Sequence, residues 1–234
     1  MRWLERQQQV ETAIYDVIDE LSDQLSITVS SYPKVWWMGR TVKFQDMGLP
    51  SYLKEELEIR NSKGISYYIV SHKTVIIAKK STQHAILEEA SHAFHFISSG
   101  VSYKNRKTKD LQCLAVLVEM FGLLGARLIG SDFENPYENF PDLASLTKES
   151  QKEVKKIILK KIGENCDFNE FFIHQQGYGL ADRIYFKYLS GEVSLSRIRR
   201  MFLSKFLSHD GAINSFVRLR NEFWPQEQSQ ATKS

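Results

Sequence analysis

Residues 65–98 read ISYYIVSHKTVIIAKKSTQHAILEEASHAFHFIS, and the pattern of apolar residues changes along them. Ile65–Val70 and Thr74–Ala78 are rich in β-branched and aromatic residues, and a short polar segment separates them. This pattern predicts two strands joined by a tight turn. From Thr82 to Ser98 the pattern becomes helical, so we expect the strand pair to lead directly into a helix.

The rest of the chain is predicted to be mostly helical. Apolar residues recur every three or four positions from Trp3 to Leu25, which is typical of an amphipathic helix, whereas Pro33–Pro50 has no helical period. A short helix is expected at Tyr52–Ile59. Beyond Ser98, further helices are expected at residues 108–129, 147–162, 169–189, 194–207 and 211–223. The predicted fold class is therefore α+β, a mostly helical domain with a small early β-sheet.

The chain of 234 residues is long enough to bury a sizeable core. We expect a single domain over residues 1–224. It would consist of an N-terminal helix (1–26), a sheet with an irregular region (33–80) and a helical core (81–224). The polar residues 225–234 are expected to form a flexible tail.

The composition is that of a folded globular protein, with 42% hydrophobic and 25% charged residues. A net charge of +3 is spread along the chain, so no nucleic-acid partner is expected. Two cysteines, Cys113 and Cys166, lack a CxxC spacing and fit a reducing compartment. The first residues do not resemble a signal peptide, and no uninterrupted apolar run approaches the length of a membrane span. We therefore expect a cytoplasmic protein with no membrane partner.

The helix predicted at residues 82–98 carries acidic and imidazole side chains at a metal-binding spacing. Glu88 and His92 are four residues apart, so they lie on one helix face and can close on a single ion. In the HExxH zinc signature, residues at this spacing hold the metal, and the Glu that follows the first of them is the general base. Glu89 occupies that position here. His84 is about 12 Å from His92 along the helix axis, too far to share one ion. It is expected either to contact Glu88 or to be exposed.

Residues 88–95, EEASHAFH, resemble the helix of gluzincin metallopeptidases, whose motif in the thimet oligopeptidase and oligoendopeptidase families is HExxHAxH. Glu89 and the segment HAFH that begins at His92 match this motif, and Glu88 stands where the family has its first metal-ligand histidine. The resemblance extends over residues 65–188, about half of the chain, and the chain length is closer to that of the small minigluzincins. It implies a zincin-like hydrolase with a degenerate EExxH motif.

The same resemblance implies a third metal ligand, a Glu from a later helix. Glu119 is the candidate, because it is the lone acid in the apolar stretch Leu117–Ala126. Such an acid is costly to bury unless it pairs or meets a cation. Gly122 and Gly125 would let this helix pack closely against the motif helix. The predicted metal site thus consists of Glu119 and the two ligands on the motif helix, and zinc is the implied ion.

His174 and Tyr178 resemble the His and Gly-Tyr segment with which these oligopeptidases stabilise the oxyanion of the reaction. A Tyr hydroxyl and a His N–H are suitable donors to the charge that develops on the scissile carbonyl. The His-to-Tyr spacing is shorter than the family has, so Tyr185 is an alternative partner for His174. The strands at 65–70 and 74–78 would supply the sheet along which a peptide or protein substrate lies.

The Glu at position 88 leaves two hypotheses open. In the first, Glu88 binds the metal, and a site of two carboxylates and one imidazole leaves its water less acidic and makes manganese or iron(II) more competitive with zinc. In the second, no metal is bound, and the protein is a catalytically inactive pseudo-peptidase that binds a peptide or protein without cutting it. In that case Glu88, Glu89 and Glu119 would raise one another's pKa, unless His92 or Arg127 neutralises them.

Two other classes of protein account for less of the sequence. Residues 89–92 form the ExxH of di-iron carboxylate bundles, but the sequence contains no second ExxH. A plain helical interaction module would explain the helices but not the convergence of acids and histidines on one helix face. Tolerance of substitution at Glu89 would separate such a module from a hydrolase.

Overall fold

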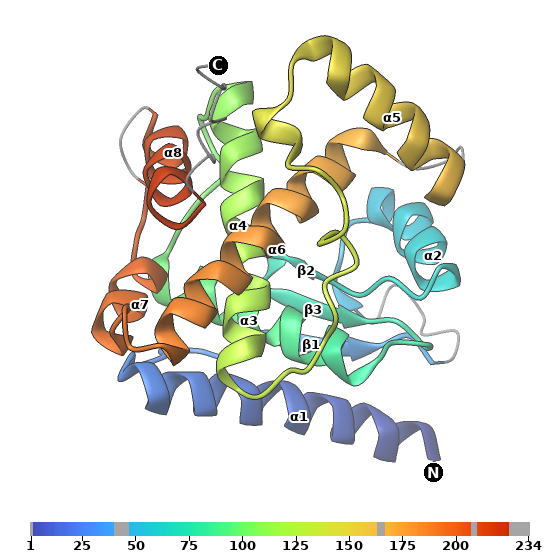
Figure 1. Cartoon of the computed structure of the whole chain (residues 1–234). Coiled ribbons are helices and arrows are strands. Elements are labelled where there is room, and N and C mark those ends of the chain that lie inside the picture. The colour runs from blue at the N-terminus through green and yellow to red at the C-terminus, as the bar shows by residue number, and fades with distance from the viewer. Residues whose placement is uncertain (1, 40–46, 163–166, 207–209, 225–234) are drawn as a thin grey trace, which may run out of the picture. The chain divides into compact units, whose positions relative to one another are not determined.

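The structure is a computed structural model that describes residues 2–39, 47–162, 167–206 and 210–224. These residues form eight α-helices and one small sheet of three strands near the N-terminus, so the predicted α+β class is confirmed (Figure 1). The elements are α1 (Arg2–Leu25), β1 (Lys34–Trp37), α2 (Lys54–Ser62), β2 (Tyr67–Ile69), β3 (Thr74–Ile77), α3 (Gln83–Ser99), α4 (Thr108–Leu128), α5 (Lys148–Ile162), α6 (Phe168–Leu189), α7 (Leu195–Phe202) and α8 (Gly211–Phe223).

The chain divides into two compact units. The first comprises residues 1–102, 121–133 and 193–205, and the second comprises residues 103–120, 134–192 and 206–234. One boundary falls inside helix α4, so this continuous helix contributes its first part to the second unit and its last part to the first unit. The expectation of one domain over residues 1–224 stays a prediction, and the expected tail at 225–234 lies outside the described residues.

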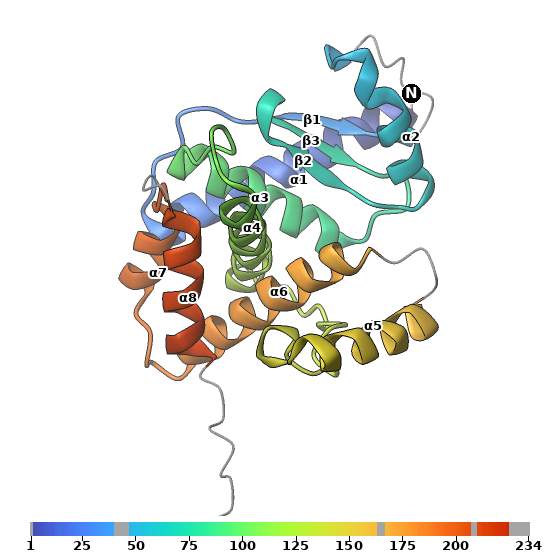
Figure 2. The ribbon, with the colours of Figure 1, turned by 90° about the horizontal axis from the view of Figure 1, so that it is seen from above.

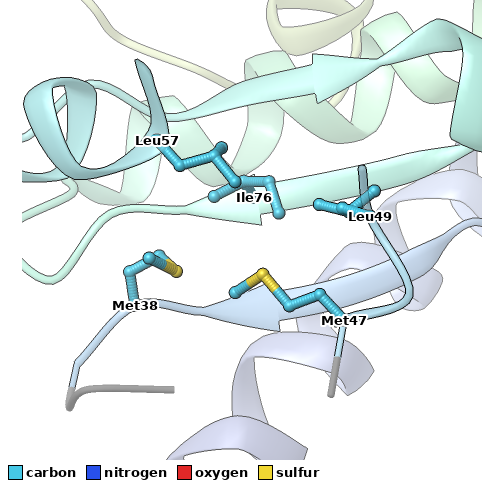
Figure 3. Close-up of a cluster of buried hydrophobic side chains, with 5 residues drawn as sticks. All are labelled: Met38, Met47, Leu49, Leu57 and Ile76. Carbon is cyan, nitrogen blue, oxygen red and sulfur yellow. The ribbon is translucent and has the colours of Figure 1, made fainter. Parts of the chain in front are cut away.

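The sheet of the first unit has the strand order β1-β3-β2. Strand β3 lies in the middle, parallel to β1 and antiparallel to β2, with Ile76 opposite both Trp36 and Tyr67. All four residues of β3 are buried, which fits its run of β-branched residues. On one face of the sheet, Ile76 packs in a cluster with two methionines and two leucines (Figure 3). These partners are Met38, Met47, Leu49 and Leu57, the last of them from α2.

Helices α1 and α3 pack against each other and against the sheet (Figure 2). The ring of Tyr68 in β2 lies 5.6 Å from that of Phe96 in α3. Gln7 of α1 also holds the edge strand β1, because its amide donates to the carbonyl of Val35 and accepts from the backbone N–H of Trp37, each at 2.8 Å. Helix α3 therefore follows β3 closely in the chain and packs on the sheet through β2 and β3.

Buried polar groups organise the second unit. Asp110, fully buried in α4, accepts hydrogen bonds from the backbone N–H groups of Ala212 and Ile213 at the start of α8, at 2.9 and 3.3 Å. Burial alone would raise the pKa of Asp110, but the Arg106 guanidinium and these two N–H groups hold it below its ordinary value. The carboxylate of Asp142 likewise accepts a hydrogen bond from a guanidinium group, that of Arg220 in α8. These bonds connect α4 and the 134–147 segment to α8.

Helix α4 is long and apolar enough to cross a membrane, judged by length and composition alone. Most of its apolar window is buried within the structure, and the core helix of a soluble protein meets the same criterion. The helix therefore gives only a weak indication of a membrane. Cytoplasmic location and the absence of a membrane partner stay predictions.

Candidate metal centre

Helix α3 presents the residues of the EExxH motif at the buried part of its length. Glu88 is partly buried, while Glu89 and His92 are only 8% and 7% exposed. One ligand atom from each of Glu88, His92 and Glu119 lies within 4.8 Å of the other two. The structure thus brings the three predicted ligands together, and this group could hold a metal ion.

Close helix packing explains how Glu119 reaches the motif helix. A Cβ atom at Gly122 of α4 would lie only 2.3 Å from the His92 ring, and one at Gly125 would lie 2.6 Å from Cβ of Ser91. Neither position has room for a side chain, which confirms the predicted role of the two glycines. Because Glu119 is one helical turn before Gly122, it lies on the same face of α4 as that contact. The two glycines therefore let the last part of α4 pack closely on α3 beside Ser91 and His92.

The donor set has the composition that a divalent ion requires. Two carboxylates and one imidazole are common zinc ligands, and the ligand atoms of a tetrahedral zinc site lie about 3.4 Å apart, given bond lengths of about 2.1 Å. One ligand atom from each of Glu88, His92 and Glu119 lies within 4.8 Å of the other two, so these side chains must draw closer together to reach the spacing of bound ligands. The two negative charges of this group also balance a divalent cation. The residues present therefore fit a metal ion, but they do not determine which one.

His84 lies beside Glu88, which was one of the two positions predicted for it. The His84 Nε2 atom lies 3.3 Å from Oε2 of Glu88, but it has no hydrogen-bond partner among the described residues. Its Nδ1 atom lies 3.0 Å from the Ser131 hydroxyl oxygen. The ring also stacks on Phe133, with the centroids 3.7 Å apart and the planes 2° from parallel. The alternative that His84 is exposed is wrong, because its side chain is 13% exposed.

Glu89 is close to the strand that borders the sheet. The pKa of the Tyr67 hydroxyl in β2 is raised well above its ordinary value, mainly by burial, and Glu89 contributes to the shift through its negative charge. The carboxylate of Glu89 is therefore near β2, on the helix face next to that of Glu88 and His92. A general base at this position would lie between the ligand-bearing face of α3 and the edge strand.

His174 and Tyr178 lie one turn apart on α6, and His174 contacts the third carboxylate. Its Nε2 atom is 3.5 Å from Oε2 of Glu119, and its Nδ1 atom is 2.8 Å from the carbonyl oxygen of Glu170. Because a carbonyl oxygen only accepts, Nδ1 carries a hydrogen, and Nε2 is the atom left to face Glu119. The Tyr178 ring lies edge-on to the His174 ring, with centroids 5.6 Å apart.

Tyr185, the other candidate oxyanion donor, is remote from His174. It follows His174 by eleven residues on α6, which is about 16 Å along the helix axis. Its ring contacts those of Phe186 and Tyr188. The geometry therefore favours Tyr178 over Tyr185 as the partner of His174.

Gly177 has a packing role that the sequence analysis did not assign to it. A Cβ atom there would lie 2.6 Å from Cβ of Glu119 and 2.8 Å from the carbonyl oxygen of Val116. Helix α6 thus approaches α4 directly beside the third carboxylate, as α4 approaches α3 beside His92. The signal was present in the sequence, because a glycine inside a helix weakens it unless close packing requires the glycine.

His95 lies in an aromatic environment. The side chain is fully buried, its ring stacks on Phe121 with a centroid distance of 4.0 Å, and it meets Phe202 edge-on. Burial, with a smaller contribution from His92, lowers the pKa of His95 to about 3. The imidazole is therefore neutral at physiological pH.

Comparison with known proteins adds no relative. No family model, no curated protein and no solved structure matches the chain. The gluzincin resemblance therefore stays a prediction from the motif residues.

Proposed function

We propose that the protein is a metal-dependent, peptidase-like protein of gluzincin type. The observation that carries this proposal is the convergence of Glu88, His92 and Glu119 on a space small enough for one ion. A second acid, Glu89, follows the first ligand directly and is buried next to it. Ligands at i and i+4 of one helix, an acid at i+1 and a carboxylate from a later helix together support a hydrolytic metal site.

Zinc is the proposed ion, with manganese and iron(II) as close competitors. Replacing one imidazole by a carboxylate makes the donor set harder, and harder donors favour manganese and iron(II) more than histidine does. Zinc remains compatible, because it accepts carboxylate oxygen as readily as imidazole nitrogen in four-coordinate sites. The second carboxylate also lowers the net positive charge of the loaded site, which weakens its effect on the acidity of a water molecule.

The residues around the site have separate proposed roles. When bound, a divalent ion supplies Lewis acidity to a water molecule and to a peptide carbonyl. Glu89 would accept the proton of the attacking water and pass it to the leaving amine. Tyr178 would donate a hydrogen bond to the negative charge on the carbonyl oxygen. His174 would donate from Nε2 only with both ring nitrogens protonated, because its Nδ1–H is engaged by the carbonyl of Glu170. The substrate class is a peptide or protein, held as an added strand along β2, the edge strand near Glu89.

A metal-free binding module is the alternative function, and one observation favours it. His84 and His174 each contact a carboxylate of the group, Glu88 and Glu119 respectively. As imidazolium cations they could balance these charges without an ion. In that case the protein would bind a peptide as a pseudo-peptidase and release it uncut.

A Glu89→Gln variant tests the proposed hydrolase. We expect wild-type protein loaded with zinc or manganese to cleave a mixed peptide library, and the variant to lose about 100-fold or more of that activity, as expected for loss of a general base. The variant should keep its metal and its circular dichroism spectrum. Glu58→Gln, an exposed acid on α2, is the matched control and should remain fully active. A fully active Glu89→Gln variant would contradict the assigned base, and a wild type that binds peptides without cleaving them would support the pseudo-peptidase.

A further inference from the structure

We propose that His84 is a positioning residue for Glu88, and that its fixed location allows a Glu to replace the first metal-ligand histidine. The inference rests on the proposed metal centre and adds a residue to it. A Glu side chain has one more rotatable bond than a His side chain, so a carboxylate at position 88 loses more freedom when it binds an ion. A contact that already holds the carboxylate would reduce this loss.

His84 is held from outside its own helix. Ser131 contacts Nδ1 of the imidazole at 3.0 Å, and the Phe133 ring covers one face of it at a centroid distance of 3.7 Å. The Ser131 hydroxyl oxygen also accepts from the backbone N–H of Phe133, at 3.4 Å. The His84 ring therefore has its orientation fixed by two residues that themselves form one short segment.

The segment that carries Ser131 and Phe133 is anchored to the end of α4. Gly130 adopts a left-handed conformation with φ of 89°, and its N–H bonds to the carbonyl of Arg127. The N–H of Ser131 bonds to the carbonyl of Ala126, which completes a Schellman motif. The Arg127 guanidinium also donates to the carbonyl of Ser131 at 3.0 Å. His84 is thus clamped by the capped end of the helix that supplies the third ligand, Glu119.

The chemistry of this contact works with a neutral imidazole. A Ser hydroxyl can donate to Nδ1 of His84, which leaves the ring hydrogen on Nε2, the atom that faces Oε2 of Glu88. Both side chains are largely shielded from water, at 13% and 12% exposure for His84 and Glu88. Nε2 of His84 has no hydrogen-bond partner among the described residues, so the 3.3 Å contact must realign to become a hydrogen bond when Glu88 takes up an ion. Glu88 can then give one carboxylate oxygen to His84 and the other to an ion, as metal-ligating carboxylates commonly do.

The test is a metal titration of the full-length protein and four variants with Mn²⁺ and Zn²⁺, followed by calorimetry. His84→Ala should bind each ion about 10- to 100-fold more weakly than wild type, as for loss of a group that orients a ligand. His84→Gln keeps an N–H near the position of Nε2 but loses the stacked ring, and it should recover most of the affinity. Ser131→Ala should lie between wild type and His84→Ala. His72→Ala, in the turn before β3, is the control and should bind as wild type does.

The readout separates positioning from a merely structural role. If the His84 ring only filled space on Phe133, Gln would not restore affinity, and the electron paramagnetic resonance spectrum of bound Mn²⁺ would be the same in every variant that still binds. We expect a changed spectrum in His84→Ala and a near wild-type spectrum in His84→Gln. Wild-type affinity in His84→Ala would overturn the inference and leave the metal centre intact. A wild-type protein that binds no ion would instead overturn the metal centre itself.

Discussion

Two imidazole–carboxylate pairs flank the candidate metal centre, and they are built in opposite ways. His84 and Glu88 are neighbours on one helix, but His84 is held by Ser131 and Phe133, which lie 47 or more residues away in the chain. His174 and Glu119 come from two helices, α6 and α4, but His174 is held by a carbonyl one turn before it.

The difference predicts how firmly each carboxylate is held. The first pair is the more buried, with side chains 13% and 12% exposed, against 24% and 20% in the second pair. It is also fixed by tertiary contacts at Nδ1 and on one face of the His84 ring. A pair anchored in this way keeps its geometry when the helix ends fluctuate, whereas a contact at 3.5 Å between partly exposed groups is easily lengthened. We therefore expect substitutions near the first pair to affect metal binding and those near the second pair to affect stability more.

The largest effect should come from adding a methyl group at Gly177. Its new Cβ would meet the Val116 carbonyl oxygen at 2.8 Å, a backbone atom that cannot turn away. Helix α6 must then shift from α4, and we expect Gly177→Ala to lower the free energy of unfolding by about 1–3 kcal/mol in urea denaturation.

Gly122→Ala is the matched change beside the other helix pair. Its Cβ would meet the imidazole of His92, a side chain that can rotate. We expect a smaller loss of stability than in Gly177→Ala, because a side chain can move away from the new methyl group more easily than a backbone carbonyl can. Metal affinity should fall more than in Gly177→Ala. A larger loss of stability in Gly122→Ala than in Gly177→Ala, or a larger loss of metal affinity in Gly177→Ala, would contradict this comparison of the two helix contacts.

The free energy of unfolding, measured as a function of pH, should show the contribution of His95, the buried imidazole near the end of α3. Its pKa of about 3 is below the ordinary value near 6.5, so between these values the unfolded chain binds a proton that the folded chain does not. Stability is therefore lost as the pH falls through this window, by up to about 1.4 kcal/mol per pH unit.

His95→Phe should reduce this acid sensitivity while keeping the aromatic packing on Phe121. Protonation of the buried carboxylates Asp110 and Asp142 also destabilises the protein at low pH. Both carboxylates are present in the wild type and in His95→Phe, so the difference between the two stability curves reports His95 alone. Parallel curves from urea denaturation at pH 4.5 to 7 would contradict the assignment.

The smallest effect is expected from His174→Ala. Its contact with Glu119 is longer and more exposed than that of His84 with Glu88. We expect metal affinity to fall only about two- to fivefold, below the range for groups that orient a ligand firmly. The measurement is the same calorimetric titration. A loss as large as in His84→Ala would mean that both imidazoles position their carboxylates equally.

Local patterns predicted much of the fold and the first half of the site. The β-branched run at 74–77 and the apolar period after Thr82 were enough to place β3 and α3. The spacing of Glu88 and His92 fixed their common face, because both lie on one helix. Gly122 and Gly125 were also readable, since small residues in an apolar helix indicate close packing.

Long-range contacts were not predictable in the same way. Strand β1 lies in a segment without a clear period, and its pairing with β3 joins residues 40 apart, such as Trp36 and Ile76. The clamp on His84 depends on a helix cap whose position in space the sequence does not state. Helix α7 was expected to reach residue 207, but it ends at Phe202, and Phe206 takes a left-handed conformation. Apolar residues beyond a helix end can continue the helical period without continuing the helix.

The metal content of the purified protein shows whether Glu88, His92 and Glu119 hold a metal ion. Untagged protein purified without chelators would be analysed by plasma mass spectrometry, alongside His92→Ala and Glu119→Ala. We expect about one equivalent of zinc, manganese or iron in the wild type and its loss in both variants, which should keep the circular dichroism spectrum of the folded protein. A wild type without metal even after soaking, or variants that keep a full equivalent, would contradict the claim.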